Sequence, residues 1–268
     1  MKYYLLIISV CIFFTKSVEA QVSTAYQSHA VSFKSADGAF ILSGTLTLPE
    51  GAANAPAVVL VSGIGKQDRN GTIAGHPIFA QLSEQLSSHG IAVLRLDDRG
   101  TGKTTGLYET ATTADFADDA LMGIHFLKNL EGINPARIGL LGHSEGGMAV
   151  ATAAAKSKHV AFLVSVAGQV YAGADAAKTL AKIQVPILAL HGDKDVVADA
   201  EKNLDNWKNY SAVGGNRKVR TVMLSGLNHL FLPCRTCTIG EYATLRSDFS
   251  MRAANIITRW IHEIVAKP

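Results

Sequence analysis

The sequence predicts an α/β protein built on a mostly parallel sheet with helices on both faces. Three observations predict it. Short continuous apolar runs recur along the chain, helix-period segments alternate with them, and a glycine-rich turn leads from one apolar run into a small-residue helix. Continuous apolar runs are typical of strands buried on both faces of a parallel sheet. Their alternation with helices indicates βαβ units in a doubly wound arrangement.

The first two strands differ from the others because apolar and polar residues alternate in them. Residues 30–35 and 40–48 are expected to form an antiparallel pair, joined by the turn Ala36-Asp37-Gly38. The pattern then changes to continuous apolar runs. We expect parallel strands at residues 57–61, 91–96, 137–141, 160–166, 187–190 and 219–224, and helices at residues 78–88, 115–130, 146–155, 199–210 and 247–265.

Composition and charge favour one globular domain without a nucleic-acid partner. The chain has 268 residues, is 48% hydrophobic and carries a formal net charge of +3. No Pro/Ser-rich linker, charge block or repeat divides it, so we expect a single α/β domain over residues 21–268. No dense basic patch with interleaved aromatic residues is present in the sequence, which argues against nucleic-acid binding.

The first twenty residues have the pattern of a secretory signal peptide. Met1-Lys2 is a basic start, residues 3–14 are apolar, and Ser17-Val18-Glu19-Ala20 ends in small residues before a cleavage point. The apolar run is shorter than the roughly 20 residues needed to cross a bilayer, so we expect no stable membrane anchor. The sequence therefore predicts export, with the mature protein in the periplasm or outside the cell.

The most informative motif is Gly142-His143-Ser144-Glu145-Gly146, between an apolar strand and a helix. A serine on such a sharp turn is exposed as a nucleophile, and glycines on both sides leave room for the turn. The amide of Glu145 would lie at a helix N-terminus, where it could bind a developing oxyanion. The alternative interpretation is an ordinary glycine-rich turn between strand and helix.

A serine nucleophile needs a base and a carboxylate that orients the base. Two loops at carboxyl ends of expected strands supply candidates. One contains Asp193 and Asp195, and the other contains His229, which follows the last strand and precedes the last helix. Of the nine histidines, His229 is singled out by that position, while the residues alone leave both aspartates open as the acid.

The order of serine, aspartate and histidine resembles that of the α/β-hydrolase superfamily, over roughly residues 31–264. The resemblance implies Asp195 as the acid, because family loops read His-Gly-x-x-Asp, with Asp193 as a turn residue. It also implies that the amide of Ile64 is the second oxyanion donor, since Ile64 follows the strand that ends at Ser62-Gly63. The alternative for this segment is a tight turn.

Two further segments resemble bacterial esterases of the serine-aminopeptidase-like branch. They are residues 66–71, Lys-Gln-Asp-Arg-Asn-Gly, and residues 96–104, Leu-Asp-Asp-Arg-Gly-Thr-Gly-Lys-Thr. Their polar residues are expected to fix loop geometry through ion pairs and turn hydrogen bonds. A nucleotide-binding loop is not expected, because Asp97 stands where such a loop needs its first glycine.

The remaining features of the sequence concern substrate specificity and the chemistry of the loops. Only residues 167–185 separate two strands where relatives insert a helical cap, so we expect a minimal cap and an open site for small or exposed acyl groups. Tyr171 and Leu230-Phe231 are either pocket walls or core. Cys234 and Cys237 are expected to form a small disulfide that stiffens the loop of His229.

The sequence therefore predicts an exported carboxylic-ester hydrolase that works through an acyl-enzyme with Ser144, His229 and Asp195. Its partner would be a small-molecule ester, with no metal or other cofactor. A peptidase or thioesterase would use the same groups. A binding protein of the same fold without catalytic activity is the alternative from a different class.

Overall fold

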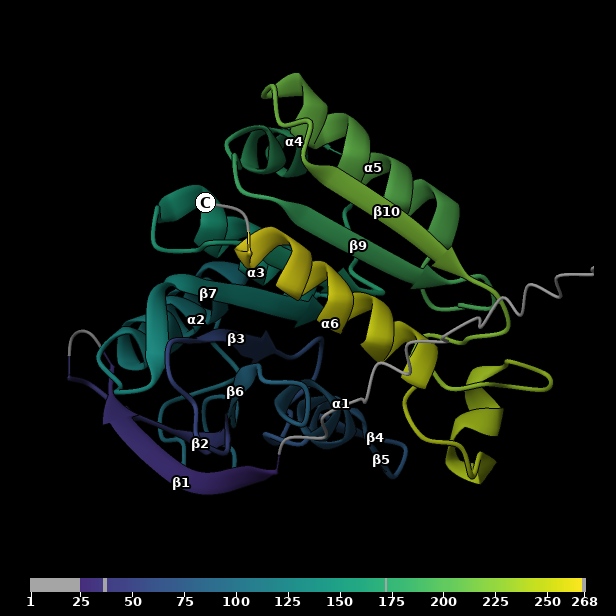
Figure 1. Cartoon of the computed structure of the whole chain (residues 1–268). Coiled ribbons are helices and arrows are strands. Elements are labelled where there is room, and N and C mark those ends of the chain that lie inside the picture. Colours follow the sequence, from purple (N-terminus) through teal and green to yellow (C-terminus); the bar gives the residue numbers. More distant parts are fainter. Residues whose placement is uncertain (1–24, 36–37, 172, 267–268) are drawn as a thin grey trace, which may run out of the picture.

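The computed structural model describes residues 25–35, 38–171 and 173–266 (Figure 1). The signal peptide expected at residues 1–20 lies outside the described residues. Eight strands form one sheet in the order β1-β2-β6-β3-β7-β8-β9-β10. These strands are β1 Tyr26–Lys34, β2 Ile41–Pro49, β3 Ala55–Val61, β6 Ala92–Leu96, β7 Ile133–His143, β8 Leu163–Val166, β9 Ile187–Gly192 and β10 Val219–Leu224.

The sheet has an antiparallel start and is parallel from β6 onward. Strand β2 pairs antiparallel with both β1 and β6. All pairings from β6 through β3, β7, β8 and β9 to β10 are parallel. The predicted fold class is confirmed, and the carboxyl ends of β7, β9 and β10 lie at one edge of the sheet.

Helices cover both faces of the sheet (Figure 1). On one face, the core contains residues of α1 (Ile78–Ser87) and α6 (Met251–Val265). On the other face, it contains residues of α2 (Thr113–Lys128), α3 (Gly146–Lys156), α4 (Ala174–Ala181) and α5 (Ala200–Val213). The two buried layers hold the sheet between them, which gives the strand ends fixed positions.

Several boundaries differ from the sequence prediction. Helix α2 begins at Thr113 because Thr112 and Asp115 form a capping box, in which each side chain bonds the backbone of the other residue. Helix α6 begins at Met251, after Ser250, whose hydroxyl accepts a hydrogen bond from the Ala253 amide. Strand β8 is shorter than expected and β7 longer.

Four elements were not predicted. They are α4, the short pair of β4 (Thr72–Ile73) and β5 (His76–Pro77), and the 3₁₀ helix η1 (Ile239–Thr244). Helix α4 has only eight residues, of which Leu180 is the one that is buried. Helix α4 lies in the stretch where a cap would occur and packs beside α5 instead, which agrees with the predicted minimal cap.

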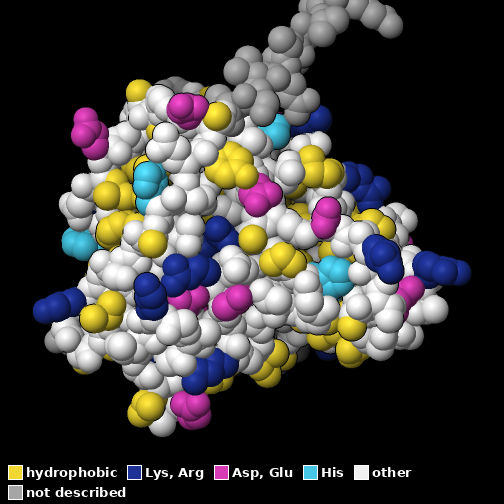
Figure 2. Space-filling model, turned by 90° about the horizontal axis from the view of Figure 1, so that it is seen from below, with side chains coloured by type: hydrophobic (Ala, Val, Ile, Leu, Met, Phe, Trp, Pro, Cys, Tyr) yellow, Lys and Arg dark blue, Asp and Glu magenta, His cyan; other side chains and the backbone are white. Residues whose placement is uncertain are grey.

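The surface carries charges of both signs. Figure 2 shows acidic and basic side chains interspersed among hydrophobic ones over one face of the molecule. Among the residues that the structure describes, no helix is long and apolar enough to cross a membrane.

Candidate active site

Ser144 lies on the turn between β7 and α3 in a conformation that side chains rarely adopt. Its φ is 55°, in the left-handed region that favours glycine. The Ser144 amide donates to the Val166 carbonyl at 3.1 Å, and the Ser144 carbonyl accepts from the amides of Gly147 and Gln169 at 3.0 Å each. These bonds hold the strained residue in place, as is typical of functional sites.

The glycines of the motif provide space for this turn. A Cβ on Gly142 would collide with the backbone of Gly146, and a Cβ on Gly146 would collide with the carbonyl oxygens of Val61 and Ser62. Neither glycine has a positive φ, so the strained conformation belongs to Ser144 itself.

The three side chains expected to act together meet in the structure. Ser144 Oγ lies 3.0 Å from His229 Nε2, and His229 Nδ1 lies 2.7 Å from Asp195 Oδ2. Because a carboxylate only accepts, Nδ1–H donates to Asp195 and Nε2 is left to accept the Ser144 proton. Each of the three residues lies in a loop that follows the carboxyl end of a strand: Ser144 follows β7, Asp195 follows β9 and His229 follows β10.

Asp195 is held as an anion. Burial by itself would raise the pKa of this carboxyl, but the imidazoles of His191 and His229 on either side and the Ala198 amide outweigh burial and hold the pKa well below its usual range. Its Oδ1 also accepts the Val197 and Ala198 amides at 2.9 Å each. The structure places Asp195, rather than Asp193, against the imidazole.

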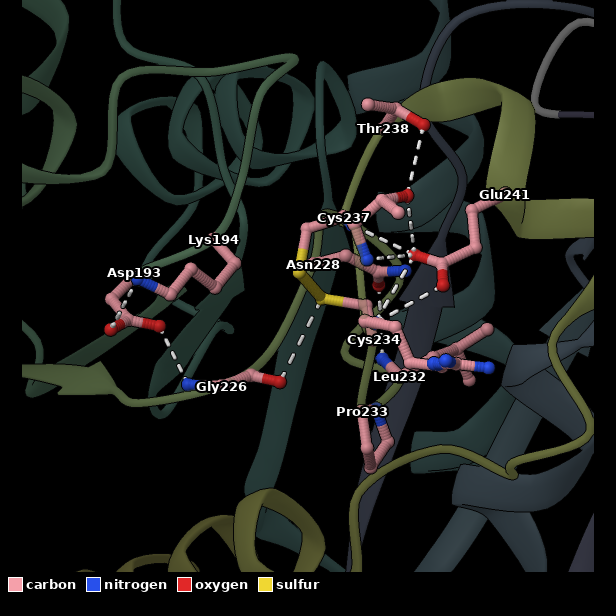
Figure 3. Close-up of a disulfide and its surroundings, with 12 residues drawn as sticks. Asp193, Lys194, Gly226, Asn228, Leu232, Pro233, Cys234, Cys237, Thr238 and Glu241 are labelled. Atoms are coloured by element: carbon pink, nitrogen blue, oxygen red, sulfur yellow. Dashed lines mark hydrogen bonds and ion pairs between the residues drawn. A yellow bond between two sulfur atoms is a disulfide. The ribbon is translucent and has the colours of Figure 1, made fainter.

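Asp193 has a different role in the same loop. Its Oδ1 accepts the amide of Gly226 at 2.6 Å, which joins the turn after β9 to the turn after β10. Lys194 Nζ lies 3.7 Å from its other oxygen (Figure 3). These contacts position the loop that carries His229.

Two amides near Ser144 are free to bind an oxyanion. Within the described part of the chain, the amides of Glu145 and Ile64 donate to no protein acceptor. Glu145 is the N-cap of α3, where amides lack intrahelical partners. A Cβ on Gly63 would come within 2.8 Å of the Ser144 Cβ, so the loop that carries Ile64 runs against the nucleophile.

Asp98 ties together the two ends of this loop. It accepts the Ser62 hydroxyl at 2.7 Å and the Gln67 amide at 2.8 Å. Burial raises the pKa of Asp98 to about 6, against the opposing effect of these two hydrogen bonds. The residue therefore fixes the segment from Ser62 to Gln67.

Arg69, Asp97 and Arg99 of the two esterase-like segments form ion pairs, as expected. Arg69 pairs with Asp97 through Nε at 3.0 Å and through Nη2. Arg99 Nε donates to Asp119 at 2.8 Å, which joins the loop after β6 to α2.

Glu145 borders one of two small cavities, and Tyr171 borders the other. The first, of about 220 Å³, is also lined by Ser62, Gly63, Gly146, Tyr108 and Thr113. The other, of about 200 Å³, includes Gln169, Tyr171, Val197 and Asn203. The Tyr171 hydroxyl lies 2.6 Å from Gln169 Oε1 and 3.0 Å from Glu145 Oε1. Tyr171 therefore lines a cavity, whereas Leu230 and Phe231 are fully buried core.

Two histidines near the site were missed by the sequence analysis. His143 Nε2 donates to the backbone carbonyl of His229 at 2.9 Å. His191 is fully buried, with Nδ1 3.5 Å from Asp195 Oδ2. The partner of His143 is 86 residues away along the chain, and the partner of His191 lies in the loop that follows it. No periodic pattern in the sequence therefore distinguishes these two histidines from the others. Only their places beside Ser144 and Asp195 in the sequence could have drawn attention to them.

The loop after His229 is closed by the Cys234–Cys237 disulfide, with the two Cα atoms 5.0 Å apart (Figure 3). Glu241 supports the same turn by accepting the amides of Thr236 at 2.9 Å and Cys237 at 2.7 Å. In the described residues, no group of three or more His, Cys, Asp or Glu side chains is arranged to hold a metal ion.

Comparison with known proteins gives a family for part of the chain. Residues 56–174 match the family described as serine aminopeptidase, S33. This segment contains Ile64, Ser144 and Glu145, but not Asp195 or His229.

Proteins similar to this chain include two curated relatives and one solved structure. Esterase EstD of Thermotoga maritima is 36% identical over 117 residues, which are 44% of this chain and 28% of that protein. Thiohydrolase AneE of Aspergillus aculeatus is 31% identical over 137 residues, which are 51% of this chain and 40% of that protein. The chain thus covers less than half of either relative. Est1E of Butyrivibrio proteoclasticus, solved with ferulic acid bound, superimposes with a TM-score of 0.67 at 19% identity, over 89% of this chain and 100% of Est1E.

Proposed function

We propose that this chain, which belongs to the α/β-hydrolase superfamily, is a serine hydrolase that cleaves small or exposed carboxylic esters through an acyl-enzyme. One observation carries the proposal. Ser144 Oγ, the His229 imidazole and the Asp195 carboxylate form a continuous chain of hydrogen bonds of 3.0 and 2.7 Å. This is the arrangement that lets a neutral alcohol lose its proton as it attacks.

In the first half-reaction, Ser144 Oγ attacks the ester carbonyl while His229 Nε2 takes the hydroxyl proton. The carbonyl oxygen becomes negative and binds the amides of Glu145 and Ile64. Asp195 stabilises the imidazolium through its bond to Nδ1. Collapse of the tetrahedral intermediate expels the alcohol, which receives the proton from His229. Water then attacks the acyl-enzyme, again with His229 as base, and releases the acid and free Ser144.

The cavity bordered by Gly63 and Glu145, which lie next to Ser144, supports small substrates. Its volume of about 220 Å³ suits short groups rather than long acyl chains. The activity named for the Thermotoga maritima relative, an esterase, also supports ester cleavage.

Other acyl substrates would use the same groups. A thioester is the second candidate, because a relative with 31% identity is named a thiohydrolase. A peptide is a third, since the matching family is described as a serine aminopeptidase. Turnover of oxygen, sulfur and amide analogues of one acyl group separates the three.

We also propose that the protein is exported. The signal-like pattern of residues 1–20 supports export, and so does the Cys234–Cys237 disulfide, since such bonds persist in oxidising compartments. Cell fractionation of the full chain, with sequencing of the mature N-terminus, tests this proposal.

A fluorophosphonate probe and a series of 4-nitrophenyl esters test the catalytic proposal. Wild type is expected to be labelled and to prefer acetate and butyrate over longer chains. Ser144→Ala is expected to lose labelling and to lose turnover by about 10⁴-fold or more, with an unchanged melting temperature. A wild type that is folded, unlabelled and inactive on every acyl donor would instead support a silent binding protein.

A further inference from the structure

His143, the variable residue of the Gly-x-Ser-x-Gly motif, contacts the proposed base directly. Its Nε2 donates to the backbone carbonyl of His229 at 2.9 Å. The centroids of the two imidazole rings lie 5.0 Å apart, and the Phe79 ring meets His143 edge-on with centroids 6.4 Å apart. Only 2% of the His143 surface is exposed. The imidazole is therefore held in one orientation by packing.

The charge state of His143 suits a fixed hydrogen bond. Burial lowers the pKa of this imidazole to about 3, so it is neutral near pH 7. A neutral imidazole has one N–H, and the contact with the carbonyl assigns that hydrogen to Nε2. The bond to His229 therefore does not depend on protonation in the working pH range.

Consecutive residues of one turn thus bind His229 at two points. Ser144 Oγ contacts the His229 imidazole, and His143 contacts the His229 carbonyl. Within the described part of the chain, these are the two hydrogen bonds between residues 142–147 and the loop at residues 226–233. Other hydrogen bonds of that loop connect it to residues outside the nucleophile turn; for example, the Lys194 amide donates to the Leu227 carbonyl at 3.0 Å.

The two hydrogen bonds to His229 are present at different stages of the proposed reaction. In the resting enzyme, the Ser144 hydroxyl donates to His229. Once Ser144 Oγ carries an acyl group, it has no hydrogen and that bond is lost. The His143 bond remains, and His229 must then be correctly placed to take a proton from water. A displacement of the base by about 1 Å can reduce a rate on the order of 100-fold.

We infer that His143 is a positioning residue that holds the His229 imidazole in place beside Ser144 during deacylation. The inference rests on the proposed acyl-enzyme reaction. It predicts that loss of the His143 hydrogen bond slows hydrolysis of the acyl-enzyme more than its formation, because only the second step lacks the Ser144 bond.

The test compares His143→Met with His143→Gln. The two replacements have similar size, but only Gln keeps an N–H that reaches the position of Nε2. With 4-nitrophenyl acetate, single-turnover release of 4-nitrophenol by excess enzyme gives the acylation rate, and kcat then gives the deacylation rate. Rates are expressed per active site, and the active sites are titrated with the fluorophosphonate.

His262→Met is the control. His262 Nε2 also donates to a backbone carbonyl, that of His89 at 2.8 Å, but this bond lies near the amino end of β6 and not at the carboxyl ends that carry the site.

For His143→Met, we expect deacylation to slow about tenfold and acylation to change less than about threefold, so that kcat and KM fall together. His143→Gln is expected to restore deacylation to within about threefold of wild type, and His262→Met to leave both rates unchanged. Equal slowing of both steps by Met, or a Gln variant as slow as Met, overturns the inference. An enzyme that forms no acyl intermediate would overturn the proposed function instead.

Discussion

Two buried carboxylates near Ser144 have pKa values shifted in opposite directions. Asp195 lies between the imidazoles of His191 and His229 and accepts two amides, so its charge is well compensated. Asp98 accepts hydrogen bonds only from a hydroxyl and an amide, and the effect of burial, which raises its pKa, exceeds the lowering effect of these two bonds. Asp195 is therefore anionic throughout the useful pH range, whereas Asp98 titrates near pH 6.

The Asp98 shift predicts a dependence of stability on pH. Its pKa is about 6 in the folded chain, above the value of about 3.9 for an unfolded aspartate. The protonated form is thus favoured by folding, and this contribution is complete below about pH 4 and lost as pH rises through about 6. We expect wild type to lose up to about 3 kcal/mol relative to Asp98→Asn between pH 4 and pH 7.

Urea denaturation of both proteins at the two pH values measures that difference. Asp175→Asn, at a fully exposed position on α4, is the control and is expected to show no such change. A wild-type-to-Asn difference that is equal at both pH values would contradict the raised pKa of Asp98.

The two aspartates of the loop after β9 are distinguished by catalysis. Asp195→Asn removes the acceptor that orients the His229 tautomer, so kcat is expected to fall about 10³–10⁴-fold. Asp193→Asn keeps an oxygen that can accept from Gly226, and kcat is expected to stay within about threefold of wild type. Steady-state kinetics on 4-nitrophenyl acetate gives both values, and the reverse ranking would assign the acid to Asp193.

The loop from Gly226 to Thr238 joins β10 to the η1 helix and carries His229. Several interactions hold it besides the disulfide. Asn228 Oδ1 accepts the amides of Leu230 and Leu232 at 3.0 Å each, Leu227 and Pro233 form an isolated bridge, and Glu241 accepts amides of the turn between the cysteines (Figure 3). The position of His229 thus depends on the whole loop.

Loss of the disulfide is therefore expected to have a modest effect. A four-residue ring restricts the unfolded chain little, so Cys234→Ser with Cys237→Ser should lower the free energy of unfolding by about 2 kcal/mol or less. The kcat is expected to fall less than about threefold, because the Asn228 and Glu241 bonds remain. Urea denaturation and turnover, each measured with and without reductant, check the prediction. If neither the melting nor the turnover of wild type changes when reductant is added, the disulfide has no stabilising role.

At the scale of the whole molecule, the sheet brings the site together while its two core layers supply the stability. Phe162 immediately precedes β8 and lies against Gly139 of β7, where a Cβ would collide with the Phe162 ring. The Phe162 ring also meets the Trp260 ring of α6 edge-on, with centroids 6.0 Å apart. It is fully buried and joins the sheet to a covering helix, away from the strand ends that carry Ser144 and His229.

Replacement of Phe162 should therefore separate stability from catalysis. Phe162→Ala is expected to lower the free energy of unfolding by about 3–5 kcal/mol, because it leaves a cavity between sheet and helix. The kcat per fluorophosphonate-titrated site at 25 °C should stay within about threefold of wild type. Denaturant melts and titrated kinetics test both parts, and a large loss of kcat in a folded variant would place Phe162 in the support of the active site.

The amino-acid sequence by itself determined the fold class, the nucleophile turn and the loops that carry the base and acid. These features depend on local patterns: apolar runs, glycines around Ser144, and polar residues directly after strands. It did not predict α4, which has only eight residues and lies between two strands in a stretch read as a connection.

Only the tertiary structure decided which groups touch. The sheet order puts the ends of β7, β9 and β10 together, and this places Ser144, Asp195 and His229 within hydrogen-bond distance. The same order gave His143 its partner 86 residues away and put Asp98 across both ends of the Ile64 loop. Such contacts leave no periodic trace, because they join loops whose spacing along the chain is set by intervening helices and strands.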